Sequence, residues 1–204
     1  ENYQTFRVDV GSLQAQLSLA PRESGAGMTN FSVMDLPMPD GSMRKYKVVE
    51  SPILSPELEQ KTGVKTYMVQ SIDNPRENGR IDFGPNGFHG LVRGTDGGSF
   101  VIEPVAQGQQ NGVFVYYRRD NTIPRQLRCL TQEGSSYRFN FRDPSLFSIM
   151  NVGGTLKAYR LAMNATGEYT AFHGGEVSAL NAIATTINRV NSIYMVDVAI
   201  RLNI

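Results

Sequence analysis

Very few side chains of the usual catalytic or metal-binding kinds occur in this sequence. Its 204 residues include one cysteine, Cys129, and two histidines, His89 and His173. A single cysteine cannot form a disulfide within the chain or a Cys-x-x-Cys metal site. Neither histidine lies in a His-Glu-x-x-His pattern, and the chain has no Gly-x-Ser-x-Gly, Gly-x-Gly-x-x-Gly or P-loop motif. The residues by themselves therefore indicate a chain with few of the side chains and motifs that enzyme active sites use.

Each histidine has two readings. His173, in Phe-His-Gly-Gly, lies just before an expected helix, where it could bind a ligand or could shape the turn and bond a backbone group. His89 alternates with Phe88 along an expected strand, which predicts a solvent-facing side chain rather than a metal ligand. The glycine-rich turns at Asp40 and Asp96 lack the run of oxygen ligands that calcium requires.

Charge and hydropathy exclude two classes of function. Twenty Lys and Arg against 19 Asp and Glu give a formal net charge of +1, which does not suit a strongly basic nucleic-acid binder. No apolar run approaches the roughly 18 residues that a membrane span needs. Hydrophobic residues make up 40% of the chain, which is enough for a packed core.

The elements that must position these residues change in type along the chain. Leu13, Leu17 and Ala20 share one face of a short helix that Ser12 can cap and Pro21 ends. Ser55 and proline at the next position predict one helical turn over 55–61. Short strands separated by glycine and proline turns predict an antiparallel meander or sandwich. These strands are expected at 65–72, 79–83, 87–93, 99–103 and 112–118.

The end of the chain predicts a β-α-β unit. Strands are expected at 157–165 and 197–204, and apolar residues at helical spacing predict a helix over 176–191 that packs on the sheet through this stripe. The stripe consists of Val177, Leu180, Ile183, Ala184, Ile187, Val190 and Tyr194. Such crossovers join parallel strands and are nearly always right-handed. Because one unit cannot bury both faces of its sheet, we expect a truncated or processed α/β domain, or a pairing with another chain.

One family resemblance follows from these residues. The segment 159–204 contains YRLAMNATGEYTAFHGG, then TTINRVNSIYMVD and AIRL. It resembles the opening of the catalytic domain in bacterial reprolysin-like zinc metalloproteases, which are metzincins. The upstream phrases LPMPDGSMRKYKVVESPILSPEL and GRIDFGPNGFHGLV look like the prodomain of the same proteins. The zinc motif HExxHxxGxxH of that family does not occur here, so its ligands and general-base glutamate would lie beyond Ile204.

The resemblance implies a secreted zymogen, and it gives Cys129 a possible role. A prodomain thiolate can fill the open fourth position of catalytic zinc and displace the water, which is a cysteine switch. Arg125 and Arg128 would favour the thiolate or pair with active-site carboxylates. The surroundings of Cys129 differ from the PRCGVPD-like switch of matrix metalloproteases. The other reading is a small buried hydrophobe beside Leu127 and Leu130.

The sequence therefore predicts an α+β chain: a mostly antiparallel β prodomain at 1–118, a linker or inhibitory segment at 119–154, and an incomplete β-α-β unit of a metzincin-like domain at 155–204. Its expected function is to assist folding and hold a zinc endopeptidase latent. Zinc would belong to the parent enzyme and not to this chain alone. The expected partners are the remainder of the catalytic domain or a cleaved companion chain, with protein substrates for the parent. The alternative is an extracellular β-rich protein-binding or adhesion module without catalytic activity.

Overall fold

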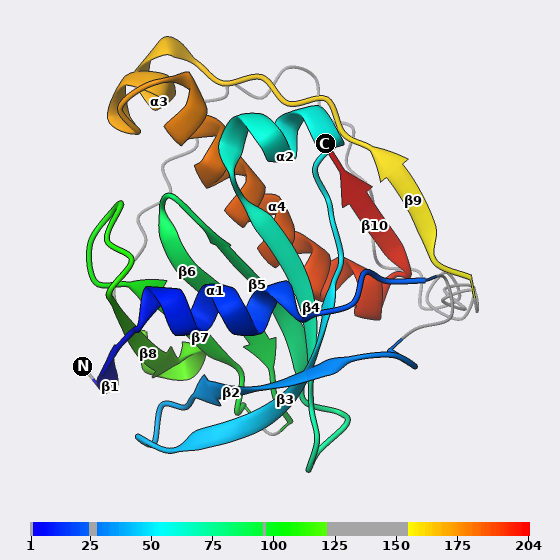
Figure 1. Ribbon diagram of the computed structural model, residues 1–204. Helices are drawn as coiled ribbons and strands as arrows, with labels where there is room; N and C mark the ends of the chain where they lie inside the picture. The colour runs from blue at the N-terminus through cyan, green and yellow to red at the C-terminus, as the bar shows by residue number, and fades with distance from the viewer. Residues whose placement is uncertain (1, 25–27, 96, 122–154) are drawn as a thin grey trace, which may run out of the picture.

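A curled antiparallel sheet dominates the computed structural model, which describes residues 2–24, 28–95, 97–121 and 155–204 (Figure 1). Eight strands of this part of the chain follow one another in the order β1-β8-β7-β6-β5-β4-β3-β2. They are β1 (Tyr3–Arg7), β2 (Ser32–Pro37), β3 (Met43–Glu50), β4 (Lys65–Ser71), β5 (Asn78–Gly84), β6 (Gly87–Arg93), β7 (Phe100–Pro104) and β8 (Gly112–Tyr117). The expected antiparallel meander is confirmed from β2 to β8.

The main hydrophobic core lies between the sheet and helix α1 (Val10–Ser18), which crosses the face of the sheet that is toward the viewer in Figure 1. Leu13 and Leu17 are buried there, as their spacing predicts. The side chain of Asp9, and not that of Ser12, caps the helix by accepting from the Ser12 backbone N–H at 3.2 Å. The sequence also gave no sign of β1, whose pairing partner β8 lies more than a hundred residues away.

Helix α2 (Pro56–Thr62) forms as its sequence predicts. The Ser55 side chain accepts a hydrogen bond from the Leu58 backbone, and Pro56 occupies the first turn, where its missing N–H costs nothing. Gly63 ends the helix in the left-handed conformation, with φ of 67°, which glycine adopts without strain. A short 3-10 turn, η1 (Arg118–Asp120), follows β8.

A β-α-β unit forms the end of the chain. Strand β9 (Lys157–Arg160) pairs in parallel with β10 (Ile200–Asn203), and helix α4 (Glu176–Asp197) connects them. The parallel pairing is confirmed, but β9 is shorter than expected and α4 extends six residues further. A helix that the sequence did not suggest, α3 (Gly167–Phe172), precedes α4. No helix of the described part is long and apolar enough to cross a membrane.

Helix α4 packs on β5 and β6 on the side opposite to α1, so the sheet lies between the two helices (Figure 1). The buried face of the helix coincides only in part with the predicted apolar stripe, of which Ala184 and Ile187 are buried. Val177 and Tyr194 are 40% and 44% exposed, and mostly small and polar residues take the buried positions. These are Ala179, Asn181, Ala184, Thr185, Ile187, Asn188, Asn191 and Ser192. The reason is that the face of the sheet beneath α4 carries the buried charges of Arg80 and Asp82.

An apolar cluster and two backbone hydrogen bonds complete the contact. Ile53, Leu54 and Val64 pack against Ala184 and Ile187 of α4. The Ser55 N–H donates to the Ile204 carbonyl at 2.8 Å, and the Ile204 N–H donates to the Ile53 carbonyl at 2.7 Å. The segment before α2 thus extends the small parallel sheet beyond β10.

Candidate functional site: a buried polar contact between β5 and α4

Strand β5 carries two charged residues on the face that α4 covers. Ile81 and Phe83 alternate with Arg80 and Asp82, so the apolar pair enters the main core and the charged pair faces the helix. Arg80 and Asp82 are each only 2% exposed. Charged side chains are almost never buried so deeply unless they have partners, and here the partners come from α4.

Asn188 of α4 contacts both charges. Its Oδ1 accepts from Arg80 Nε at 2.6 Å, and its Nδ2 donates to Asp82 Oδ1 at 2.9 Å. Asn188 is fully buried. An asparagine suits this position because its amide has an acceptor at one end and a donor at the other. The pair Arg80 and Asp82 therefore recognises one particular side chain on one turn of the helix.

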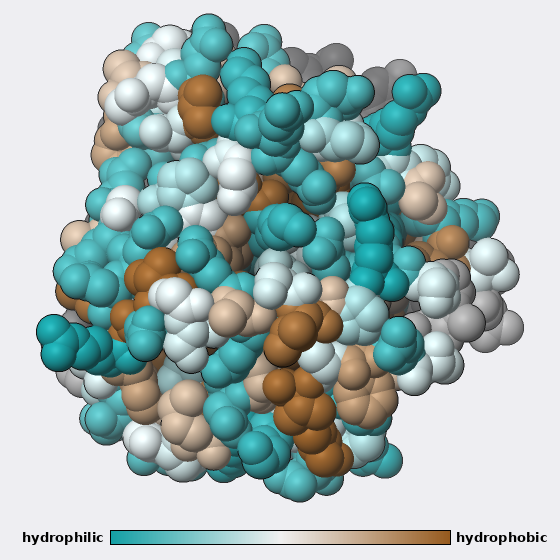
Figure 2. Space-filling view, viewed as in Figure 1, coloured by the Kyte–Doolittle hydropathy of each residue, from teal (hydrophilic) through white to brown (hydrophobic). Residues whose placement is uncertain are grey.

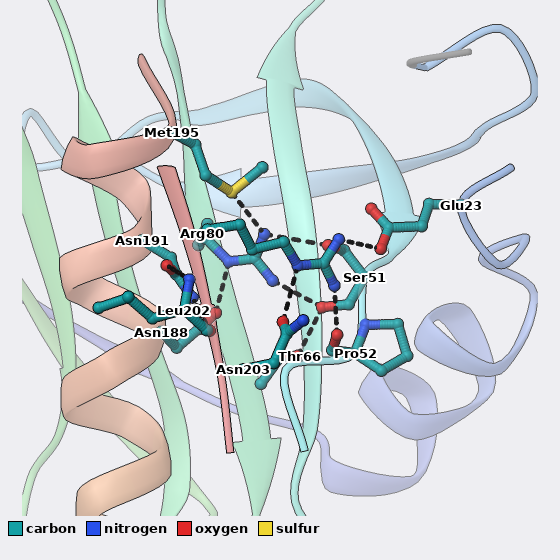
Figure 3. A network of polar contacts seen from close by, with 11 residues as sticks. Glu23, Ser51, Pro52, Thr66, Arg80, Asn188, Asn191, Met195, Leu202 and Asn203 are labelled. Carbon is teal, nitrogen blue, oxygen red and sulfur yellow. Dashed lines mark hydrogen bonds and ion pairs between the residues drawn. The ribbon is translucent and has the colours of Figure 1, made fainter. Parts of the chain in front are cut away.

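The rest of the Arg80 guanidinium is held by neutral acceptors. Nη1 donates to Ser51 Oγ at 3.0 Å and contacts Met195 Sδ at 3.4 Å, and Nη2 donates to the Ser51 carbonyl at 2.6 Å. Figure 3 shows Arg80 between Ser51 on one side and Asn188 and Met195 on the other. Burial, together with the nearby charge of Arg201, lowers the pKa of Arg80 to about 9, so it remains a cation at neutral pH.

Asp82 is the matching buried anion. Thr185 Oγ1 donates to its Oδ2 at 2.7 Å, and His89 Nδ1 lies 3.2 Å from the same oxygen. Burial alone would raise the pKa of Asp82, but the contacts with His89, Thr185 and Asn188 outweigh it and hold the pKa below 3.8. Asp82 is therefore ionised at neutral pH.

The prediction that His89 faces solvent is wrong. Its side chain is only 14% exposed because α4 covers this part of β6. The distance to Asp82 is that of an ion pair, but the Nδ1 atom forms no hydrogen bond among the described residues, so the angle and not the distance is unfavourable. We take the contact as electrostatic. Alternation along β6 placed His89 on the correct face, and only the helix made that face an interior.

Further ion pairs surround this centre. Arg189 of α4 donates to Glu103 of β7 at 2.9 Å, and Arg93 of β6 pairs with Asp197 at the end of α4 at 2.9 Å. Arg201 of β10 binds Glu23 and the Pro52 carbonyl. The β-α-β unit is thus tied to the sheet and its connections by charged groups along its whole length.

The outer part of this contact leaves polar atoms without partners. Among the described residues, the buried atoms that make no hydrogen bond are His89 Nδ1, Arg93 Nη1, Asn181 Oδ1, Arg189 Nε and Arg189 Nη2. All of them belong to β6 or α4.

A cavity of about 240 Å³ opens beside the same contact. Its walls include both histidines, together with Glu103, Gln107, Thr185 and Arg189. Gln107 Nε2 lies 3.3 Å from His173 Nδ1. The nearest hydroxyl to the Asp82–His89 pair is that of Thr185, and it already donates to Asp82, so this arrangement holds no free nucleophile. No group of three His, Cys, Asp or Glu in the described ranges could hold a metal ion.

The remaining predicted residues have different outcomes. His173 ends α3, its N–H donates to the Tyr169 carbonyl, and its ring lies against that of Tyr169, which matches the turn-shaping reading. Arg125, Arg128 and Cys129 lie outside the described residues. The central residues of the contact were missed by sequence reasoning. The alternation Arg-Ile-Asp-Phe in β5 could have indicated Arg80 and Asp82. By itself, however, this alternation fits a strand with one solvent-exposed face equally well.

Comparison of the chain with family models, curated proteins and solved structures found no match.

Proposed function

We propose that this chain is the propeptide region of a secreted zinc-dependent endopeptidase together with the first β-α-β unit of its catalytic domain. The sheet would assist the folding of that unit and hold the protease latent. The observation that carries the proposal is the fully buried Asn188, which bonds both Arg80 and Asp82 of the sheet. A propeptide that acts as a folding template needs a surface that accepts one helix in one register, and this contact supplies it.

The energetics of the contact suit a release step. A buried charge that loses its partner is destabilising by several kcal/mol, so a misplaced α4 would be rejected. Once the helix leaves, water can solvate Arg80 and Asp82, whereas a purely apolar surface would aggregate.

The chemistry would belong to the parent enzyme. When bound there, zinc would polarise the scissile carbonyl and lower the pKa of the attacking water. The proposal places the zinc ligands and the general-base glutamate beyond Ile204. Cys129 would occupy the open zinc position before activation, with Arg125 and Arg128 as supporting cations.

The test uses the complete product of the gene. We expect the purified protein to contain zinc and to hydrolyse casein only after the sheet-forming region has been removed by limited proteolysis. Asp82→Asn places an amide where Thr185 and Asn188 donate, so it should raise the activity of the unprocessed protein. Asp35→Asn is the matched control, because Asp35 lies on edge strand β2 with its side chain 51% exposed.

Three results would overturn parts of this proposal. A protein without zinc or peptidase activity after processing would exclude the zymogen and favour the adhesion or binding module. If unprocessed Asp82→Asn hydrolyses casein no faster than Asp35→Asn, with unchanged circular dichroism, the buried contact has no role in latency. If unprocessed Cys129→Ser is no more active than the unprocessed wild type, only the cysteine-switch part of the proposal is excluded.

A further inference from the structure

A second cavity lies at the opposite face of the sheet, away from α4. It has a volume of about 630 Å³ and is bounded by α1, α2, the start of β4 and the β5–β6 turn. Figure 2 shows apolar surface set among hydrophilic side chains between α1 and α2. Its volume falls within the roughly 300–1,000 Å³ range of small-molecule sites. None of its lining residues belongs to the α4 contact.

The walls of the cavity are mostly apolar. Aliphatic and aromatic side chains from four separate elements supply them: Leu17, Pro56, Tyr67, Phe83 and Pro85. Tyr67 and Phe83 also belong to the main core and are only 2% and 8% exposed, so this part of the cavity has a fixed shape. Side chains held in place by a sheet can form a fixed floor for an apolar body.

One acid of this cavity has no partner. The Glu59 carboxylate lines the wall, is partly buried, and forms no ion pair or hydrogen bond among the described residues. The neighbouring Glu50 is different, because Lys65 Nζ lies 3.3 Å from its Oε2. Burial is the main cause that raises the pKa of Glu59, and Glu50 adds to it against the weaker pull of Arg22 and Lys65. Lys65 also lines the cavity but pairs with Glu50, so Glu59 is left without a bonded cation.

The Tyr67 hydroxyl supplies a second polar group. Tyr67 lines the cavity, and its hydroxyl makes no hydrogen bond among the described residues. Burial also raises its pKa, with contributions from Glu50 and Glu59, so the hydroxyl keeps its proton at neutral pH. A carboxylate and a hydroxyl above an apolar floor form a compact acceptor set.

We propose that this cavity binds a small organic amine, in which an apolar body packs between α1 and the aromatic floor while the ammonium pairs with Glu59. An anionic ligand would lie beside the Glu59 carboxylate, and a neutral one would leave Glu59 unpaired. The amine adds the missing partner in a partly desolvated position, where a charge-assisted hydrogen bond is stronger than at the surface. This site is independent of the proposed propeptide function.

The experiment compares three probes that share one apolar body and differ in charge. Binding of 4-phenylbutylamine, 4-phenylbutanol and 4-phenylbutyrate to the chain is measured by amide chemical-shift titration. We expect the amine to bind most tightly, with shifts in α1, α2 and β4. Its affinity should weaken at acid pH as Glu59 takes a proton, beginning above the ordinary glutamate value of 4.5 because the pKa of Glu59 is raised.

Two variants locate the site. Glu59→Gln should weaken amine binding about tenfold and leave the alcohol unchanged, since it removes the charge and keeps the shape. Glu57→Gln, on the exposed side of the same helix, is the matched control and should change nothing. Gln14→Trp should block all three probes by filling the rim.

Equal affinity for the amine and the alcohol, or an unchanged amine affinity in Glu59→Gln, would overturn the charge recognition. Absence of any saturable shift in the lining residues would overturn the site itself. Thermal melts confirm that each variant is folded, since none of the three replaced side chains lies in the core.

Discussion

Replacement of Asn188 by alanine is the sharpest test of the buried contact. The change removes the acceptor for Arg80 Nε and the donor for Asp82 Oδ1 at once. It leaves a buried cation and a buried anion each with one unmet bond. Both groups keep other partners, namely Ser51 for Arg80 and Thr185 for Asp82, so neither charge is left without a hydrogen bond.

The expected magnitude follows from those two bonds. A hydrogen bond to a charged group contributes about 1.5–3 kcal/mol, so the sum lies at about 3–6 kcal/mol. Water can enter the space that the amide leaves, which favours the lower end. We expect the free energy of unfolding to fall by about 3 kcal/mol, which is a large part of the total of roughly 5–15 kcal/mol for a typical domain.

Urea unfolding followed by far-ultraviolet circular dichroism measures this loss, with thermal melts as a second readout. For a chain of this size, about 3 kcal/mol corresponds to a fall in Tm of roughly 6–12 °C. Thr186→Ala is the matched control on the same helix. Thr186 is exposed and its hydroxyl bonds only the Ala182 carbonyl, so we expect a change within about 0.5 kcal/mol.

Asn188→Asp tests the hydrogen bond to Arg80 separately from the hydrogen bond to Asp82. The new carboxylate can still accept from Arg80, but it faces Asp82 with a like charge. The loss of stability caused by Asn188→Asp should therefore become smaller as the pH falls and one of the two carboxyls takes a proton. Asn188→Ala adds no carboxyl, so it should show no such recovery. The reasoning fails if Asn188→Ala unfolds within about 1 kcal/mol of Thr186→Ala, or if the aspartate variant shows no such recovery.

The remaining predictions concern Asp82, Gly79, latency and the second cavity. The folded-state pKa of Asp82 lies below the ordinary 3.8, so its stabilising contribution is complete above that value and is lost as the pH falls through the lower folded pKa. Urea midpoints of wild type and Asp82→Asn should consequently converge in acid, and a constant gap down to pH 2 would contradict this. Gly79→Ala should destabilise by more than about 3 kcal/mol, because an added Cβ would clash with the Leu91 carbonyl oxygen. A Gly79→Ala variant as stable as wild type would contradict this close approach of β5 and β6. Casein hydrolysis by the unprocessed gene product tests latency through Asp82→Asn, and amine titration tests Glu59 in the second cavity.

Much of the local structure could be predicted from the sequence. Glycine and proline turns separate β4 to β8, and alternation within these strands identifies their core side. Helix α2 follows from serine and proline at its start, because capping depends only on neighbours in the chain. The helix between two strands at the end of the chain indicates the β-α-β unit, and the parallel pairing of β9 with β10 confirms it.

The buried contact could not be predicted in the same way. Arg80 and Asp82 have the alternation of a solvated strand face, and Asn188 lies outside the apolar stripe of its helix. Each of these residues appears ordinary until the others are placed within hydrogen-bonding distance, and Asn188 is 108 residues from Arg80 and 106 from Asp82 along the chain. β1 was missed for a related reason, since its partner is β8 and its own five residues are mostly exposed.

The sequence by itself determined the type of element in most places and the side of each strand, because backbone conformation and alternation depend on near neighbours. Only the tertiary structure decided which polar face became an interior, because burial depends on what packs above it. Helix α4 converts the charged face of β5 from a solvated surface into a specific docking contact, and α1 with α2 leaves Glu59 unpaired beside an apolar cavity. Both candidate sites arise where elements distant in sequence meet.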